Sequence, residues 1–276
     1  MLKKIKALFF INFALIAFDV NAQTRFSDST KVDSLTFVRT RDIINKLSND
    51  LFEKHTYTKE ERSLPYRLLK PKNYDSSKSY PVIIAFHNSS RIGNDNEKQL
   101  EHLSKIWIRE DVYDRYSAFV IVPQFKERSS TYSKADDGSL RSVPFNDIHV
   151  VLNFLDDFQK RYNVDKSRIY LIGYSMGGST AQNILNLAPD KFAAIVSVAA
   201  VPDFSNIHLL KQKSVFLIHG KKDAVNPYAG SEELFQKLKG NKNVVFKTFT
   251  ELNHDNITIL LLLDNEIPHW LFKQKK

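Results

Sequence analysis

A serine lies at the centre of a short glycine-bounded motif in this chain. The motif G-Y-S-M-G spans residues 173–177, follows the apolar run 168–172 and precedes a helical pattern at 178–187. A strand, a sharp turn and a helix in that order expose the serine oxygen at a helix N-terminus, where backbone N–H groups favour negative charge. Serine is a weak nucleophile unless a base removes its proton. The motif predicts that Ser175 is an activated nucleophile; the alternative is a structural joint with an inert serine.

The base that such a serine needs is expected after the last strand. His254 lies in the loop sequence E-L-N-H-D, between a strand expected at 244–249 and an apolar stretch at 257–263. His269 also comes late in the chain, but it follows Pro268 in an expected terminal helix, which favours a packing role. We therefore expect His254 to be the general base; the alternative is a surface histidine.

The base in turn needs a carboxylate that fixes its tautomer and stabilises the imidazolium. Asp223 comes shortly after the apolar run 215–218, within H-G-K-K-D, which places a carboxylate at a strand end. Asp203, after the run 193–198, is the second candidate. We predict that Asp223 is the orienting acid and that His219 has a structural role.

Acyl transfer also needs N–H donors for the developing oxyanion. Met176, the residue after the nucleophile, supplies one backbone N–H. The second should come from the loop 87–91 after the strand expected at 81–86, and Ser89 is the candidate. Asn88 adds a side-chain amide near the site, where it is expected to contact substrate; a donation from this amide to the oxyanion is the alternative.

Alternating strand and helix patterns must position these residues. Buried parallel strands are indicated by apolar, β-branched runs at 81–86, 118–123, 168–172, 193–198, 215–218 and 244–249. Helical patterns are found at 146–162, 178–187, 231–238 and from 254 into the 257–263 stretch. The alternation predicts an α/β fold, a doubly wound, mostly parallel sheet with helices on both faces. The short connection between residues 198 and 215 leaves no room for a large cap domain.

Two further segments bear on the site. Residues 57–69 are expected to form a hairpin, and 124–145 to form a long polar loop. Long loops at the carboxyl ends of parallel strands usually frame the binding site. Phe125 and Tyr132 in that loop, and Tyr174 beside the nucleophile, are therefore expected to contact substrate.

The first 22 residues have the pattern of a secretory signal peptide: a basic start, an apolar segment and V-N-A before the expected cleavage point. An uncleaved anchor is the alternative, but the apolar run is short beside the roughly 20 residues of a membrane span. We expect an N-terminal arm or helix at 23–56 and a catalytic domain at 57–276. The sequence has no cysteine, so disulfides and a lipid-modified cysteine are excluded.

Composition narrows the function classes. A hydrophobic content of 42% and an aromatic content of 12% fit a globular protein rather than a disordered one. The net charge of +9 is spread along the chain without a basic, aromatic-interleaved motif, which argues against nucleic acid binding. We find no pattern of metal ligands and no cofactor motif. Neither a metal nor a cofactor is expected, and the oligomeric state is left open.

Several motifs together resemble the α/β-hydrolase superfamily. They are L-P-Y-R-L at 64–68, Y-P-V-I-I-A-F-H at 80–87, G-N-D-N at 93–96, V-P-Q at 122–124, D-K-S-R-I-Y at 165–170, G-Y-S-M-G-G at 173–178 and H-G-K-K-D at 219–223. Over residues 57–274 the chain is similar to secreted, cap-less esterases such as polyhydroxybutyrate depolymerases and feruloyl esterases, and to the catalytic domain of prolyl oligopeptidases. The resemblance implies the chain order nucleophile, acid, base, which fits Ser175, Asp223 and His254.

The resemblance also bears on the expected function, and the chain departs from the family pattern at one position. Together with the signal peptide pattern and the short 198–215 connection, the resemblance leads us to expect an exported, periplasmic or extracellular serine carboxylesterase. The expected substrate is a small or polysaccharide-linked ester, with no membrane attachment after signal cleavage. A peptidase of the prolyl oligopeptidase type and a catalytically silent binding protein with the same fold are the alternatives; a lipase lacks an obvious lid. The family's oxyanion strand usually ends in His-Gly, whereas this chain has His87-Asn88.

Overall fold

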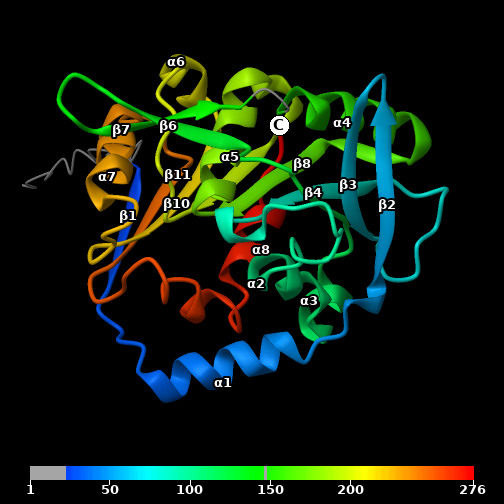
Figure 1. Cartoon of the computed structure of the whole chain (residues 1–276), viewed down its shortest axis with the longest axis horizontal. Coiled ribbons are helices and arrows are strands. Elements are labelled where there is room, and N and C mark those ends of the chain that lie inside the picture. The colour runs from blue at the N-terminus through cyan, green and yellow to red at the C-terminus, as the bar shows by residue number, and fades with distance from the viewer. Residues whose placement is uncertain (1–22, 146–147) are drawn as a thin grey trace, which may run out of the picture.

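The six apolar runs lie in one nine-stranded sheet in the computed structural model, which describes residues 23–145 and 148–276 (Figure 1). The signal peptide expected at 1–22 lies outside the described residues. The strands are β1 (Thr24–Asp28), β2 (Phe52–Lys59), β3 (Arg62–Leu69), β4 (Tyr80–Phe86), β5 (Phe119–Pro123), β8 (Val164–Tyr174), β9 (Ala194–Val198), β10 (Ser214–Gly220) and β11 (Val244–Phe249). Their spatial order is β1-β11-β10-β9-β8-β4-β5-β3-β2.

The sheet is mostly parallel, as predicted. All neighbouring pairs from β1 to β5 in the spatial order are parallel, and only β3 is antiparallel to its neighbours β5 and β2. The antiparallel β2–β3 pair is the predicted hairpin, although its first strand begins at Phe52. The parallel strands bring their carboxyl ends to one edge, which is where a binding site in such a sheet is expected.

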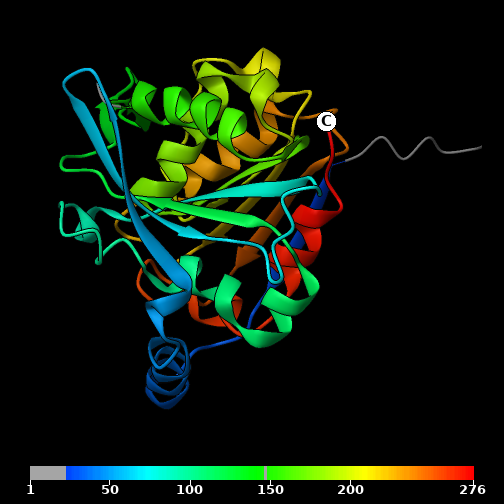
Figure 2. The ribbon, with the colours of Figure 1, turned by 90° about the vertical axis from the view of Figure 1, so that its right-hand side faces the viewer.

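Helices cover both faces of the sheet (Figure 2). They are α1 (Ser34–Asn45), α2 (His102–Lys105), α3 (Glu110–Arg115), α4 (Ile148–Arg161), α5 (Met176–Leu187), α6 (Ile207–Leu210), α7 (Tyr228–Lys237) and α8 (Glu266–Phe272). Alternate residues of each strand point to opposite faces. Accordingly, Ile83 packs in the cluster that includes α2, α3 and α8, while Ile84 packs in the cluster that includes α4, α5 and α7.

The prediction of a long loop at 124–145 is wrong in part, because the centre of this segment is a β-hairpin. Strands β6 (Ser130–Lys134) and β7 (Leu140–Pro144) pair in a separate two-stranded sheet. The Ser130 and Ser142 hydroxyls are 2.9 Å apart across it, and Ser129 Oγ lies 2.7 Å from Thr180 Oγ1 on α5. Polar composition concealed these strands because polar contacts attach the hairpin to the domain, among them Ser142 Oγ to Asn183 Oδ1 and Arg141 to Glu233.

The prediction of a helix from His254 into 257–263 is also wrong. This segment forms turns and a short 3-10 helix, Ile259–Leu261, and the helix begins only at Glu266. Asn253 Oδ1 accepts the backbone N–H groups of Asp255 and Asn256 and so closes a turn at the start of this segment. The apolar run was a sign of burial: Ile257, Leu261 and Leu262 are fully buried.

Residues 23–56 are joined to the domain along their length. β1 pairs in parallel with β11 at the sheet edge, and Ile44 of α1 is fully buried in the core. Between β9 and β10 the chain forms only the short helix α6, so no large cap domain is inserted there. Within the described residues, no helix has the length and apolar character needed to cross a membrane.

Candidate active site

Ser175 lies in a strained turn between β8 and α5. Its backbone angles are φ 57° and ψ −123°, a conformation that residues with a side chain rarely adopt. Two glycines make this turn possible, because a Cβ on Gly173 would lie 2.2 Å from Gly177, and a Cβ on Gly177 would lie 2.1 Å from Phe86 O. The start of α5 is thus pressed directly against β4, which fixes the height of the serine above the sheet.

We predict that Gly177→Ala lowers the free energy of unfolding by about 1–3 kcal/mol or more, because the new methyl overlaps backbone that cannot move aside. Gly230→Ala is the matched control, since it is also a helical glycine, and its Cβ would meet only the Pro202 ring at 3.0 Å. Urea denaturation of both variants measures the difference. Equal losses would show that the contact at β4 does not hold the turn.

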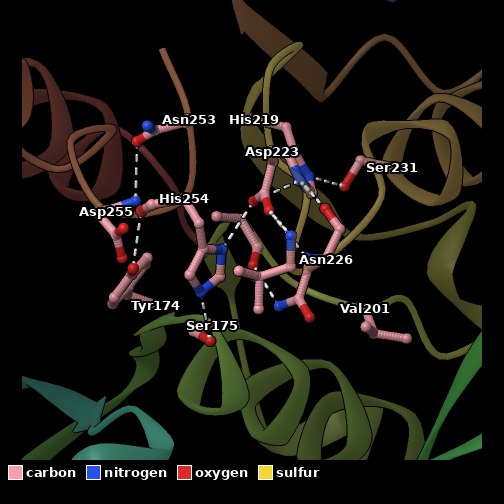
Figure 3. Close-up of polar contacts among 12 residues, drawn as sticks. Tyr174, Ser175, Val201, His219, Asp223, Asn226, Ser231, Asn253, His254 and Asp255 are labelled. Carbon is pink, nitrogen blue, oxygen red and sulfur yellow. Dashed lines mark hydrogen bonds and ion pairs between the residues drawn. The ribbon is translucent and has the colours of Figure 1, made fainter.

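The three residues predicted to act together are joined by hydrogen bonds (Figure 3). His254 Nε2 lies 3.0 Å from Ser175 Oγ, and His254 Nδ1 lies 2.8 Å from Asp223 Oδ2. All three residues are at least nine-tenths buried. They come from β8–α5, from the turn after β10 and from the loop after β11, three strand ends at one edge of the sheet.

The Asp223 carboxylate is held in its ionised form. Its Oδ1 accepts the backbone N–H groups of Val225 and Asn226 at 2.9 and 2.8 Å, and its Oδ2 faces both His254 and His219. Burial opposes ionisation, but the hydrogen bonds from His219, His254 and Asn226 outweigh it and keep the pKa of Asp223 well below its ordinary value. A permanently charged Asp223 favours the tautomer of His254 that has its proton on Nδ1.

The alternative candidates lie elsewhere. Asp203 accepts a hydrogen bond from the Asn183 amide at 2.8 Å and forms part of the anchor between α5 and the chain after β9. His269 is an exposed residue of α8. His219 is fully buried, with Nδ1 2.7 Å from Ser231 Oγ and Nε2 2.9 Å from Asn226 O. It braces the turn that presents Asp223.

Two backbone N–H groups are candidates for an oxyanion site. Within the described residues, neither Met176 nor Ser89 donates its amide N–H to another group. Asn88 precedes Ser89 with φ −76°, so this loop does not require the left-handed backbone for which glycine is suited. The replacement of the usual glycine therefore leaves the loop unstrained at this residue.

The Asn88 amide is already engaged. Its Oδ1 accepts hydrogen bonds from the backbone N–H and the hydroxyl of Ser90, and its Nδ2 donates to Glu101 Oε2. Asn88 lies at the site, but its contacts give it the role of shaping the loop. His87 braces the same loop: its Nδ1 lies 2.8 Å from Asn88 O, and its Nε2 accepts the Phe125 N–H. Burial lowers the pKa of His87 to about 4, so the ring is neutral.

A cavity of about 630 Å³ opens beside Ser175 and His254. Asn88, Ser89 and Tyr174 line it, and the Tyr174 hydroxyl also donates to His254 O at 2.8 Å. Phe125 and Tyr132 do not line it. Phe125 is buried between Phe86 and His87 and lines a separate hollow, while Tyr132 lies on the β6–β7 hairpin with the Arg128 guanidinium over its ring.

The cavity also has a wall that the sequence did not reveal. Five further residues contribute to it: Phe37, Arg41, Arg91, Glu101 and His102. The first two come from α1, so the N-terminal segment forms part of the site. No pattern in the sequence marks this wall. Arg41 and Arg91 stand out only because they are half-buried without an ion-pair partner among the described residues, and that is visible only in the tertiary structure. Within the described residues, no three His, Cys, Asp or Glu side chains are placed to hold a metal ion.

Glu101 gives this wall a pH-dependent stability. Its Oε1 is buried without a hydrogen-bond partner, and burial raises the pKa of its carboxyl to about 8, against the lowering effects of Asn88 and Arg91. The folded state therefore binds this proton more tightly than the unfolded state. Its contribution to stability is complete below the unfolded value near 4.5 and is lost as the pH rises through about 8.

We predict that Glu101→Gln, which keeps the shape and the acceptor for Asn88, gains stability relative to the wild type as the pH rises from 5 to 8. Thermal melts of both proteins across this range measure the difference in Tm, at about 2–4 °C per kcal/mol for a domain of this size. A Tm difference that stays constant over this range contradicts the assignment.

Comparisons with known proteins place this fold. Residues 125–212 match the prolyl oligopeptidase family, Peptidase_S9. A bifunctional acetylxylan esterase/xylanase from Neocallimastix patriciarum is 23% identical over 176 residues, which are 64% of this chain and 24% of that protein. The chain thus spans about a quarter of that relative's length.

Solved structures agree. A thermostable esterase superposes with a TM-score of 0.74 at 24% identity, covering 82% of this chain and 64% of the other. A ferulic acid esterase from Anaeromyces mucronatus gives 0.56 at 17% identity, covering 75% and 85%. The chain has the α/β-hydrolase fold without a large cap domain. Its similarities lie with the esterases and the prolyl oligopeptidase family that share this fold.

Proposed function

We propose that the protein is an exported serine carboxylesterase that cleaves acyl esters through an acyl-enzyme. The observation that carries the proposal is the hydrogen-bonded chain Asp223–His254–Ser175 at the edge of a cavity. In this reaction His254 Nε2 takes the proton of Ser175 as its oxygen attacks the ester carbonyl. His254 then gives this proton to the leaving alcohol. In the second half of the reaction, His254 takes a proton from water as the water attacks the acyl-serine, and returns that proton to Ser175.

The oxyanion of each tetrahedral intermediate is proposed to lie between the N–H groups of Met176 and Ser89. Neither group has another acceptor among residues 23–145 and 148–276, and Met176 is at the N-terminus of α5, whose dipole adds to the stabilisation. Asp223 holds His254 in place and balances the imidazolium charge. Preorganised donors of this kind are typically worth about 10²–10³ in kcat each.

Acyl esters on a polysaccharide are the proposed substrates. The absence of a large cap over the cavity suits an ester carried on a large molecule, and two similar proteins are named for acetylxylan and ferulic acid esterase activity. The signal-like residues 1–22 support a periplasmic or extracellular location. No cofactor is invoked in this mechanism.

A peptidase is the second candidate, favoured by the match of residues 125–212 to the prolyl oligopeptidase family. A panel of acetyl, butyryl and feruloyl aryl esters, run beside aminoacyl naphthylamides, separates the two. The esterase proposal expects turnover of at least one short ester and little cleavage of the amides. Faster cleavage of the amides would show that the protein is a peptidase rather than an esterase. No turnover of either class would favour a catalytically silent binding protein.

A further inference from the structure

Two arginines from distant parts of the chain face the cavity at Ser175. Arg41 comes from α1 and Arg91 from the 3-10 turn Ser89–Arg91, which follows β4. Both are half-buried. The Arg41 guanidinium lies 5.1 Å from the centre of the Phe37 ring, which itself lines the cavity.

Neither arginine has a carboxylate partner within the described residues, although ion pairs are frequent elsewhere on this protein. Arg91 Nε is buried and makes no hydrogen bond to any residue that the structure describes. A buried guanidinium donor without a partner is costly, and such donors are normally paired. A negatively charged ligand group in the cavity would contact the Arg91 guanidinium where it lines the wall and would offset this buried positive charge.

The two positive charges act on the same place. Burial, followed by the charges of Arg41 and Arg91, lowers the pKa of His102 to about 4, so that this cavity residue stays neutral. Glu101, the buried acid in the same wall, accepts a hydrogen bond from the Asn88 amide and forms no ion pair with either arginine within the described residues. Burial raises the pKa of its carboxyl to about 8, which favours the neutral form at pH 7. Asp255, the remaining acidic residue of the lining, is exposed at the rim.

We infer that Arg41 and Arg91 form a carboxylate-binding subsite, so that the preferred ester carries a carboxylate in the part that occupies this cavity. The inference rests on the proposed esterase function and specifies its substrate class. Guanidinium groups match carboxylates in geometry and form charge-assisted hydrogen bonds, about twice as strong as neutral ones. The carboxylate belongs either to the acyl group, as in a dicarboxylic hemiester, or to the alcohol, as in an acylated uronic acid.

Matched ester pairs test the inference and distinguish the two sources. On the acyl side, nitrophenyl hemisuccinate is compared with nitrophenyl succinamate; on the alcohol side, meta-acetoxybenzoate is compared with meta-acetoxybenzamide. Each pair differs only in a carboxylate against a neutral amide. We expect kcat/KM to be about 10-fold or more higher for the charged member of at least one pair.

The variants are Arg41→Gln and Arg91→Gln, with Arg39→Gln as the matched control. Arg39 is exposed on the same helix as Arg41 and does not line the cavity, so its loss changes the net charge equally. Both cavity variants should lose most of the preference for the charged ester, so that the ratio of kcat/KM between the charged and the neutral member falls towards one. Thermal melts show whether each variant is folded. The control should keep the preference.

Three results would overturn the inference. Equal rates for the charged and neutral members of both pairs would exclude the subsite, and so would a preference that survives in both cavity variants. An equal loss of preference in the Arg39 control would mean that only the general charge of the protein matters. In each of these cases, hydrolysis of the neutral ester would still support the proposed esterase function. Failure to hydrolyse any ester would overturn both the esterase function and the carboxylate-binding subsite.

Discussion

Ser175→Ala is expected to lower kcat for a neutral aryl ester by at least about 10⁴-fold, leaving only the residual rate that binding and the oxyanion donors supply. The reason is geometric: the Ser175 oxygen is the hydroxyl within reach of His254 Nε2, at 3.0 Å, and it is held there by a strained backbone. Initial rates with purified wild type and variant measure the effect.

Ser79→Ala is the control for this experiment, since Ser79 is an exposed serine in the loop before β4. It should retain the wild-type rate. An Ser175→Ala protein that is folded and keeps more than about a tenth of the wild-type rate would show that another residue supplies the nucleophile.

Asp223→Asn is expected to lower kcat by about 10⁴-fold without a comparable loss of fold. The N–H groups of Val225 and Asn226 require an acceptor at the Oδ1 position, so the amide oxygen of the variant must occupy it. The new NH₂ group then faces His254 Nδ1. This arrangement turns Nδ1 into an acceptor and leaves the proton on Nε2, where it blocks transfer from Ser175.

The pH dependence separates this tautomer effect from simple misfolding. The rate of Asp223→Asn should recover in part at high pH, where hydroxide ion replaces the lost base, while its Tm stays close to that of the wild type. Asp203→Asn, the matched change at the other buried aspartate, should leave kcat within about 10-fold. A larger loss for Asp203→Asn than for Asp223→Asn would reverse the assignment of the acid.

The sequence predicted the residues that follow strand ends, because a strand end carries a local signal. Ser175 lies between a strand and a helix, and Asp223 and His254 each follow an apolar run. The contacts of Asn88 could not be predicted in the same way. The sequence placed its loop after a strand, but only the structure shows that the Asn88 amide is hydrogen-bonded to Ser90 and Glu101.

Features that depend on long-range contacts were missed. Arg41 reaches the cavity because α1 packs near the loop after β11, a contact that no local pattern encodes. Phe125 was expected at the site because it follows a strand end, yet its ring is buried between Phe86 and His87. Side-chain direction decides such cases, and the order of residues along the chain does not specify it.

Labelling with a fluorophosphonate probe is the sharpest test of Ser175 as the nucleophile, because the probe reacts with a serine only when a base activates it. We expect stoichiometric labelling of the wild type, with the adduct mapped by mass spectrometry to the peptide that contains Ser175. Labelling should be lost in Ser175→Ala and slowed at least about 100-fold in His254→Ala. Ester hydrolysis by a wild-type protein that is labelled at another residue, or not labelled at all, would contradict it.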